Sequence, residues 1–309
     1  MYFLITFIRN LLFDKGLLKV RHAQIPVISV GNLTMGGTGK TPMVEYILNY
    51  LLEKGRHPSM VSRGYGRKTK GLVIARNHST AKQIGDEPLQ IYRKFDGKVP
   101  VAVAEKRHHA FYYCSKKSNC IVLDDAFQHR RVVRDLNILL TDYHRRYTHD
   151  HVLPWGRLRE SRRGARRADV IIVTKCPADL SVEEAEKIRR EIKPQPYQTV
   201  YFTTIEYDLD VEPQKVNLIT GISNPKPLVE YLENQGFTID KHYNFFDHHR
   251  FTADEKEKIC RMRPPILTTE KDYMRLPEIT DILVPVPIRV KFLFEGENDF
   301  RQQLAEVTK

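Results

Sequence analysis

The segment that most constrains the fold is a glycine-rich turn, Gly36-Gly-Thr-Gly-Lys-Thr41. It follows a short apolar run that starts at Val27, which predicts a buried strand. Pro42 then opens an apolar pattern typical of a helix, and proline is well tolerated in a first helical turn. Glycines between a strand and a helix let backbone N–H groups converge on a polyphosphate, at the positive end of the helix. The segment therefore predicts a phosphate-binding loop in an α/β nucleotide-binding fold.

Every residue of this loop is expected to contact the nucleotide: Thr34, Met35, Gly36, Gly37, Thr38, Gly39, Lys40 and Thr41. The Lys40 ammonium suits the β- and γ-phosphates of ATP, and the Thr41 hydroxyl suits Mg²⁺. Thr34 stands where the usual pattern has glycine. The alternative is a chance Gly-Lys-Thr in an ordinary turn, but the glycines, Lys40, Thr41 and both flanking elements agree on the phosphate loop.

The composition points to an acidic partner. The 309 residues include 50 Lys+Arg against 38 Asp+Glu, a net charge of +12. Such an excess suits nucleic acid, phosphorylated metabolites or an anionic membrane surface. The four cysteines show no Cys-x-x-Cys and no zinc spacing, which predicts reduced thiols. His144, His149 and His151 cluster without a recognised metal pattern.

Strand and helix patterns alternate along the first two thirds of the chain, which predicts a parallel sheet covered on both faces. The expected strands are Ser59–Ser62, Leu72–Ala75, Val99–Ala104, Cys120–Leu123, Leu136–Leu140 and Val170–Thr174. The expected helices are Thr41–Glu53, Asp86–Phe95, Lys106–Lys116 and Val182–Ile192.

After an alternating run, Thr199 to Tyr207, a second α/β pattern begins. It comprises strands Val216–Ile219, Phe237–Tyr243 and Ile266–Thr269 and helices Lys226–Gln235 and Ala253–Met262. We therefore expect a P-loop NTPase-like parallel-sheet core over residues 1–205. Residues 206–309 are expected to form a second, smaller α/β domain that closes over the active-site cleft. A late strand, Ile288–Phe294, could pair with the run from Thr199 to Tyr207 and link the two.

The first 20 residues or so are the most apolar part of the chain. Leu4, Ile8, Leu11 and Leu12 recur at helical spacing, which predicts an amphipathic helix. Arg9 interrupts a stretch that is in any case too short to span a bilayer, and no signal-peptide pattern is present. Such a helix either lies in a membrane interface or packs on the protein's own core, and the pattern alone leaves both open.

Acidic residues mark two further places. Ile121-Val-Leu-Asp-Asp125 is an apolar strand that ends in two acids, and a fold of this kind needs a carboxylate there to hold Mg²⁺. Asp124 has the expected position, whereas Asp125 could instead cap a helix. Gly85-Asp-Glu-Pro88 opens a helix, so Asp86 is either an N-cap or a functional acid. Asp247 and His248 could likewise be capping groups, or they could act as an Asp–His pair that orients a hydroxyl and takes its proton.

The stretch from Gly156 to Arg167 carries six arginines in twelve residues. It could be a solvated basic face or a nucleic-acid surface. Against nucleic acid, it lacks interleaved aromatic residues for stacking on bases. An anionic substrate, or neutralisation of charge during phosphoryl transfer, fits at least as well.

Together these motifs closely resemble one family, the tetraacyldisaccharide 4′-kinases, which are membrane-associated lipid A kinases. The resemblance runs through nearly the whole chain, in the order Val30–Pro42, Ser62–Arg67, Gly85–Pro88, Asp124–His129, Leu158–Glu160, Thr220–Pro225, Asp247-His248 and Thr268–Asp272. Thr34 is typical of this family's loop. Two positions depart from it: Ala126 replaces a usual glycine, and Pro154-Trp-Gly-Arg157 replaces a usual Pro-Ala-Gly-Pro, which leaves the backbone near the metal and the fit of the arginine loop open.

The resemblance implies an ATP-dependent kinase that transfers the γ-phosphoryl group to the 4′-hydroxyl of tetraacyldisaccharide 1-phosphate. The product would be the bis-phosphorylated lipid A precursor, lipid IVA. Carried over by motif, Lys40 would hold the phosphates, and Asp86 would be the base, paired with His248; Asp125 is the alternative base. The metal set would be Thr41, Asp124, Asp125 and Glu160, around Mg²⁺. Arg67, Arg157 and Arg159 would bind the substrate.

The lipid substrate implied by the resemblance favours the membrane interpretation of residues 1–20. We expect a peripheral or monotopic protein on the cytoplasmic face of the inner membrane, with no nucleic acid and no obligate protein partner. Two other classes of ATPase are alternatives. ATPases that position molecules on membranes carry a lysine where this chain has Met35, and a nucleic-acid-stimulated ATPase would respond to DNA or RNA rather than glycolipid.

Overall fold

The computed structural model describes the whole chain except residues 1, 248, 250, 264 and 277–278. Its larger part is a nine-stranded sheet in the order β13-β8-β7-β6-β1-β5-β2-β4-β3. The seven inner strands are parallel, and β13 and β3 pair antiparallel at the two edges. This confirms the expected α/β fold with a large parallel sheet.

The strands of this sheet are β1 (Val27–Asn32), β2 (Pro58–Ser62), β3 (Val73–Ile74), β4 (Val101–Val103), β5 (Cys120–Asp124), β6 (Leu136–Asp142), β7 (Val170–Thr174), β8 (Thr199–Tyr207) and β13 (Ile288–Phe292). Its central strands are apolar runs buried along nearly their whole length. Such runs are what a parallel sheet covered on both faces requires.

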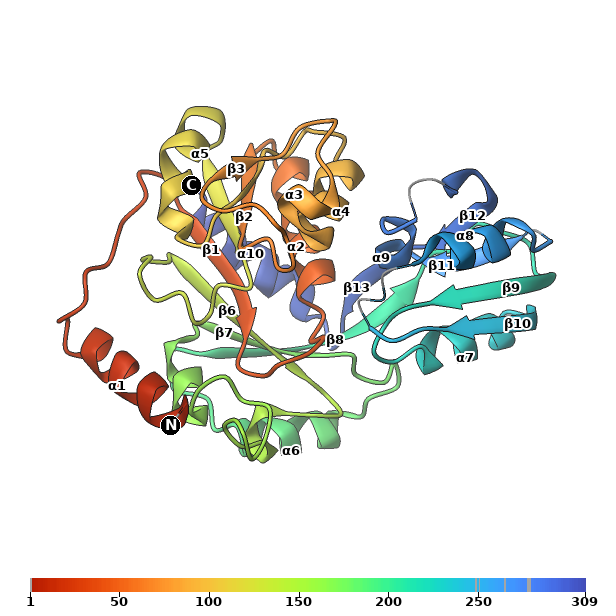
Figure 1. The fold of residues 1–309 in the computed structure, drawn as a ribbon. Helices are drawn as coiled ribbons and strands as arrows, with labels where there is room; N and C mark the ends of the chain where they lie inside the picture. Colours follow the sequence, from red (N-terminus) through yellow and green to blue (C-terminus); the bar gives the residue numbers. More distant parts are fainter. Residues whose placement is uncertain (1, 248, 250, 264, 277–278) are drawn as a thin grey trace.

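Helices cover both faces of the large sheet (Figure 1). On one face lie α2 (Lys40–Glu53), α4 (Asp86–Lys94) and α10 (Gly296–Val307), whose apolar side chains share one core with the strands. On the other lie α5 (Phe111–Lys117) and α6 (Val182–Ile192). The short α3 (Ala81–Ile84) precedes α4. The expected helix Lys106–Lys116 is divided into a 3₁₀ turn, Arg107–Ala110, and α5.

The second sheet has four parallel strands in the order β10-β9-β11-β12. These are β9 (Lys215–Thr220), β10 (Thr238–Asn244), β11 (Ile266–Thr269) and β12 (Leu283–Val286), with helices α7 (Lys226–Asn234), α8 (Ala253–Cys260) and α9 (Glu270–Tyr273). It has its own apolar clusters on its two sides. In Figure 1 this smaller unit lies beyond the β8–β13 edge of the large sheet.

The chain returns to the large sheet at its end. β13 pairs antiparallel with β8, with Ile288 opposite Tyr207, so the expected link between the two parts is present. Phe300 and Leu304 of α10 are fully buried in the core of the large sheet. Residues 288–307 therefore lie with the large sheet, although the pattern assigned them to residues 206–309. The smaller sheet itself spans residues 215–286.

The N-terminal helix α1 (Tyr2–Asp14) lies on the opposite side of the molecule from the small sheet (Figure 1). Its polar residues hold it to the large unit: Asn10 Nδ2 donates to Glu160 Oε2 at 2.6 Å, and Arg130 pairs with Asp14 at 2.6 Å. Leu4 and Ile8 are 57% and 46% exposed. The helix thus contacts the protein through polar groups and exposes apolar ones. Of the helices in the described part of the chain, none has the length and apolarity to cross a membrane.

Candidate active site

The glycine-rich loop leaves β1 and enters α2 as the pattern predicts. Gly39 precedes α2 with φ 75°, and Gly36 has φ 112°, both in the region that glycine adopts without strain. Lys40 is the first residue of α2. The loop is fixed from inside by Asn32, whose Nδ2 donates to Thr38 Oγ1 at 2.7 Å. The loop thus turns at glycines and leads into the N-terminus of α2, an arrangement that suits phosphate binding.

The arginine-rich segment is joined to this loop through its backbone. Met35 N donates to Arg157 O at 2.8 Å, and Arg159 N donates to Leu33 O at 2.7 Å. Arg157 is exposed and lies at the cavity, whereas Arg159 reaches Asp125 with Nη1 at 2.8 and 3.0 Å. The structure therefore brings Arg157 and Arg159 to the phosphate loop, which neither motif alone indicated.

Asp124 ends β5 beside the loop, opposite Val30 of β1. The residue is 2% exposed, and its Oδ2 accepts a hydrogen bond from Ser62 Oγ at 3.0 Å. Its Oδ1 has no hydrogen-bond partner among the described residues. Burial above all, together with the nearby acids Glu87 and Asp125, raises the pKa of this carboxyl to about 7. An anion here is costly unless a cation joins it.

Asp125 has the opposite electrostatic balance. Burial by itself would raise the pKa of its carboxyl, but Lys40 and Arg159 outweigh burial and lower the pKa below its usual value. Lys40 Nζ lies 3.8 Å from Asp125 Oδ1. Asp125 also has φ 45°, an uncommon conformation for a residue with a side chain. The two adjacent acids therefore differ. Cations lower the pKa of Asp125, whereas burial raises the pKa of Asp124, whose Oδ1 has no hydrogen-bond partner among the described residues.

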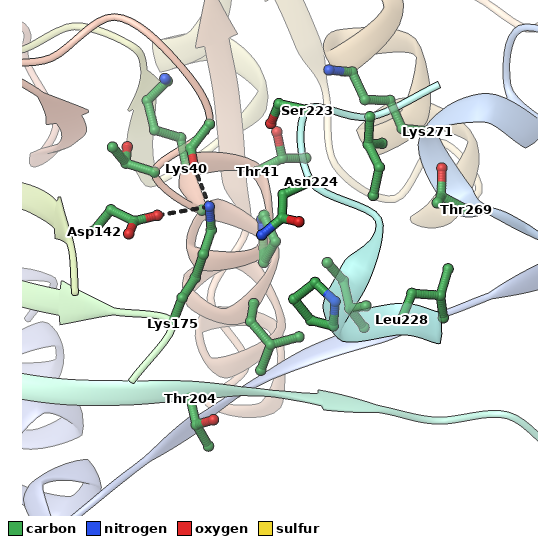
Figure 2. A pocket seen from close by; sticks show the side chains of 18 of the residues that line it. Lys40, Thr41, Asp142, Lys175, Thr204, Ser223, Asn224, Leu228, Thr269 and Lys271 are labelled. Carbon is green, nitrogen blue, oxygen red and sulfur yellow. Dashed lines mark hydrogen bonds and ion pairs between the residues drawn. The ribbon is translucent and has the colours of Figure 1, made fainter. Parts of the chain in front are cut away.

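A cavity of about 1230 Å³ lies between the two sheets and includes the whole loop from Thr34 to Thr41. Its other walls come from Glu87 of α4, the end of β8, and residues of the smaller unit such as Ser223, Asn224 and Lys271. Figure 2 shows Lys40 and Thr41 on one side of this space and Thr269 and Lys271 on the other. The space exceeds the range of about 300–1,000 Å³ typical of ligand pockets. It is large enough for a nucleotide and part of a second substrate.

Lys175 is a cavity residue that the sequence did not single out. It follows β7 in the left-handed region, with φ 57°. Its Nζ donates to Gly37 O and lies 2.9 Å from Asp142 Oδ2 at the end of β6 (Figure 2). A second lysine thus holds the phosphate loop from the side. Its place directly after the expected strand Val170–Thr174 is the signal that could have revealed it.

Asp86 is the first residue of α4, and its Oδ2 accepts a hydrogen bond from Arg275 Nε at 3.1 Å. Arg275 follows α9 in the smaller unit, so this contact joins the two sheets' helices. Asp247, from the predicted Asp–His motif, pairs with Lys271 Nζ at 3.1 Å. His248, the predicted partner of Asp86, lies outside the described residues. Glu87 and Arg275 were missed, although each lies in or beside a motif already noted.

Two predicted site residues are held in structural contacts. Arg67 has a side chain that is 3% exposed, and Nη2 reaches Glu105 Oε1 at 2.6 Å and Gly71 O at 2.7 Å. Glu160 is fully buried, and Asn10, Gln128 and Arg167 donate to its oxygens at 2.6–3.1 Å. Both side chains therefore stabilise surrounding segments. Within the described residues, no group of three His, Cys, Asp or Glu could hold a metal on its own.

Comparison with known proteins extends these observations. A model of the family described as tetraacyldisaccharide-1-P 4′-kinase matches residues 1–309. The tetraacyldisaccharide 4′-kinase of Flavobacterium johnsoniae is 43% identical over 317 residues, which cover 96% of this chain and 92% of the relative. That of Phocaeicola vulgatus is 40% identical over 338 residues, which cover 98% and 92%.

A solved structure is also similar. The crystal structure of an "apo" form of LpxK from Aquifex aeolicus in complex with ATP aligns with a TM-score of 0.79 and 28% sequence identity. The alignment covers 100% of this chain and 96% of that one. The similarity therefore spans both sheets and the cavity between them.

Proposed function

The chain belongs to the tetraacyldisaccharide-1-P 4′-kinase family, and from this membership we propose how its residues perform the reaction. The protein is a kinase that uses ATP to phosphorylate the 4′-hydroxyl of tetraacyldisaccharide 1-phosphate in lipid A synthesis. The observation that carries the mechanism is the cavity between the two sheets. It is lined on one side by the phosphate loop and on the other by the smaller unit.

The phosphates of ATP bind at the loop from Thr34 to Thr41, in contact with its backbone N–H groups and with Lys40. Phosphoryl transfer needs positioning and positive charge more than covalent chemistry. Lys40 and Arg157 line the cavity and supply that charge, while Lys175 holds the loop through Gly37 O. Arg159 affects the phosphates indirectly, because it orients the Asp125 carboxylate beside Lys40.

The acceptor hydroxyl is deprotonated by Asp86, with His248 as its partner. Asp86 begins α4 next to Glu87, which lines the cavity. Asp125 is the weaker candidate for the base, since Arg159 Nη1 donates to both of its carboxylate oxygens, at 2.8 and 3.0 Å, and Lys40 Nζ lies 3.8 Å from its Oδ1. A general base must lie within hydrogen-bond reach of the proton it abstracts.

A magnesium ion fits the acids beside the loop. The buried Asp124 has an Oδ1 without a partner among the described residues, and the raised pKa of its carboxyl reflects burial and the nearby Glu87 and Asp125. Hard cations prefer such oxygens. Asp124 and Thr41, with Glu87 or Asp125, would hold the ion. When bound, Mg²⁺ would neutralise charge on the β- and γ-phosphates. Glu160 is left out of this set because three donors already hold its oxygens.

The lipid substrate reaches the site from an anionic inner-membrane surface on its cytoplasmic side. The exposed apolar residues of α1, among them Leu4 and Ile8, and the net charge of +12 support this placement. The arginine-rich segment and α1 lie together through Asn10 and Glu160. The headgroup would therefore pass from α1 along the arginines to the loop.

The test is transfer of labelled γ-phosphate from ATP to the acylated disaccharide 1-phosphate, in wild type and in Lys40→Ala and Asp86→Asn. We expect the transfer rate to be lower than that of the wild type by several orders of magnitude in both variants. ATP binding is followed separately by thermal shift. A folded Asp86→Asn protein with normal turnover would exclude Asp86 as the base.

A further inference from the structure

A single arginine connects the proposed base to the smaller unit. Arg275 Nε lies 3.1 Å from Asp86 Oδ2, although 189 positions separate the two residues. The Arg275 side chain is 6% exposed and that of Asp86 is 31% exposed. The bond thus links a nearly buried cation of the small unit to an acid at the start of α4.

The guanidinium is fixed by groups of its own unit. Arg275 Nη1 donates to Asp272 Oδ1 at 3.0 Å and to Gly221 O at 3.2 Å. Asp272 is fully buried, and its Oδ2 accepts from Gly221 N at 2.8 Å and from Thr269 Oγ1 at 2.7 Å. A planar guanidinium held at two points loses little further freedom when it makes a third bond. Arg275 therefore presents its Nε in one direction, toward Asp86.

Other contacts already hold α4 against α9. Lys94 lies 2.7 Å from Glu270 Oε1, and Arg93 Nη1 contacts Met274 Sδ at 3.8 Å. Attachment of the two helices therefore does not depend on Arg275 alone. What Arg275 adds is a charge-assisted hydrogen bond to the carboxylate of the proposed base, and such bonds fix orientation as well as charge.

We propose that Arg275 is a positioning residue for phosphoryl transfer, which orients the Asp86 carboxylate toward the acceptor hydroxyl. This inference rests on the proposed role of Asp86 as the base. Asp272 and the Gly221 backbone orient Arg275, and Arg275 orients Asp86, so the base has its working direction only while the small unit is docked on α4. A base displaced by about 1 Å costs on the order of 100-fold in rate.

The experiment compares Arg275→Met, Arg275→Lys and the matched control Arg93→Ala, which alters the other arginine between α4 and α9. We expect Arg275→Met to lower kcat about 10- to 100-fold while KM for ATP changes by less than about twofold. Arg275→Lys should recover part of kcat, because it keeps the charge but loses the planar fork. Arg93→Ala should retain the wild-type kcat. Circular dichroism and the ATP-induced thermal shift verify folding; if Arg275→Met does not fold, Arg275→Lys against Arg93→Ala carries the comparison.

The same substitutions are then made in an Asp86→Asn background and measured by single turnover. If Arg275 acts through Asp86, the second substitution should cost less than about threefold there. An equal loss in both backgrounds, or a kcat of Arg275→Met that matches Arg93→Ala, would overturn the proposal while leaving Asp86 as the base. Normal turnover of Asp86→Asn itself would instead overturn the base assignment, and the positioning role with it.

Discussion

Lys40 and Lys175 approach the same loop from different elements. Lys40 begins α2 and lies 3.8 Å from Asp125, whereas Lys175 follows β7 and contacts Gly37 O and Asp142. A cation paired with a carboxylate and a loop carbonyl shapes the loop before any ligand arrives. We therefore expect the two lysines to affect different kinetic constants.

The first prediction concerns Lys175. Lys175→Met removes the hold on Gly37 and leaves the Asp142 carboxylate without its cation in a cavity that receives polyphosphate. We expect KM for ATP to rise about tenfold, equivalent to 1.4 kcal/mol, with a smaller change in kcat. The double variant Asp142→Asn/Lys175→Met should recover part of the affinity, because it removes the repelling charge. Steady-state kinetics measures both, and an unchanged KM in Lys175→Met would contradict the assignment.

The second prediction concerns Glu45, a 4% exposed acid on α2 that accepts from Lys94 at 2.8 Å and Gln90 at 3.0 Å. Burial raises the pKa of its carboxyl from 4.5 to about 7, despite Lys94. The folded state then binds this proton more tightly than the unfolded state. The contribution of Glu45 to stability is therefore present below pH 4.5 and is lost as the pH rises to about 7.

Glu45→Gln should remove that dependence. Between pH 4.5 and 8 the unfolding free energy of the wild type should fall, relative to the variant, by on the order of 1–3 kcal/mol. Urea unfolding at several pH values measures the difference. Parallel curves for the two proteins would mean that Glu45 has an ordinary pKa in the folded state.

At the scale of single elements, α1 has structural features of both alternatives that the sequence pattern left open. Asn10 and Asp14 bond to the large unit, while Leu4 and Ile8 stay exposed. Leu4→Ser/Ile8→Ser should weaken binding to anionic phospholipid vesicles by about tenfold or more, since each buried CH₂ contributes about 0.8 kcal/mol. Val182→Ser on α6 is the matched control, because it removes an apolar side chain that is 59% exposed on a different helix. Co-sedimentation measures binding; equal binding of both variants would remove α1 as the membrane contact.

The helix α10 packs into the core of the large sheet. Phe300 is fully buried and stacks on Phe292 with ring centroids 5.1 Å apart. Phe300→Ala should lower the unfolding free energy by about 3–5 kcal/mol, through lost burial and the cavity left behind. The exposed Gln302→Ala on the same helix should change it by less than about 0.5 kcal/mol. Denaturant unfolding checks this, and a small effect of Phe300→Ala would mean that α10 is dispensable for the core.

At the scale of the whole molecule, the smaller unit leaves and re-enters the large sheet at one place. Tyr207 of β8 stands opposite Ile288 of β13, and none of the described residues between 208 and 287 belongs to the apolar clusters of the large sheet. Each unit therefore has its own core. The candidate active site, in contrast, involves both units, since both line the cavity and the Asp86–Arg275 bond joins them.

The last prediction follows from that geometry. Replacing residues 208–287 with Asn-Gly should close β8 and β13 as a two-residue hairpin, because this dipeptide suits the type I′ turn. We expect a protein that unfolds cooperatively, with a lower denaturant m-value, and that shows no phosphoryl transfer. Urea unfolding tests the expected cooperativity and m-value, and the transfer assay tests the expected loss of activity. A variant without a cooperative transition would mean that the large unit depends on the smaller one for its fold.

The phosphate loop, the parallel sheet and the acids at the end of β5 could be predicted from local sequence patterns. Apolar periodicity fixes which side of a strand or helix is buried, and glycine and proline fix where elements turn, so these features can be read within about 10–15 residues. Motif order added the family, and with it the roles that we propose for Lys40, Asp86 and Asp124.

The contacts between residues that are distant in the sequence could be identified only in the folded structure. The contacts of Arg275 with Asp86, of Lys175 with Gly37 and of Asn10 with Glu160 join residues 189, 138 and 150 positions apart. Tertiary packing also pairs Arg67 with Glu105 and Glu160 with Arg167, and it places α10 in the core of the large sheet. Local pattern specifies that a polar side chain lies near an element's end. Its partner depends on how distant elements pack, which no short stretch of sequence encodes.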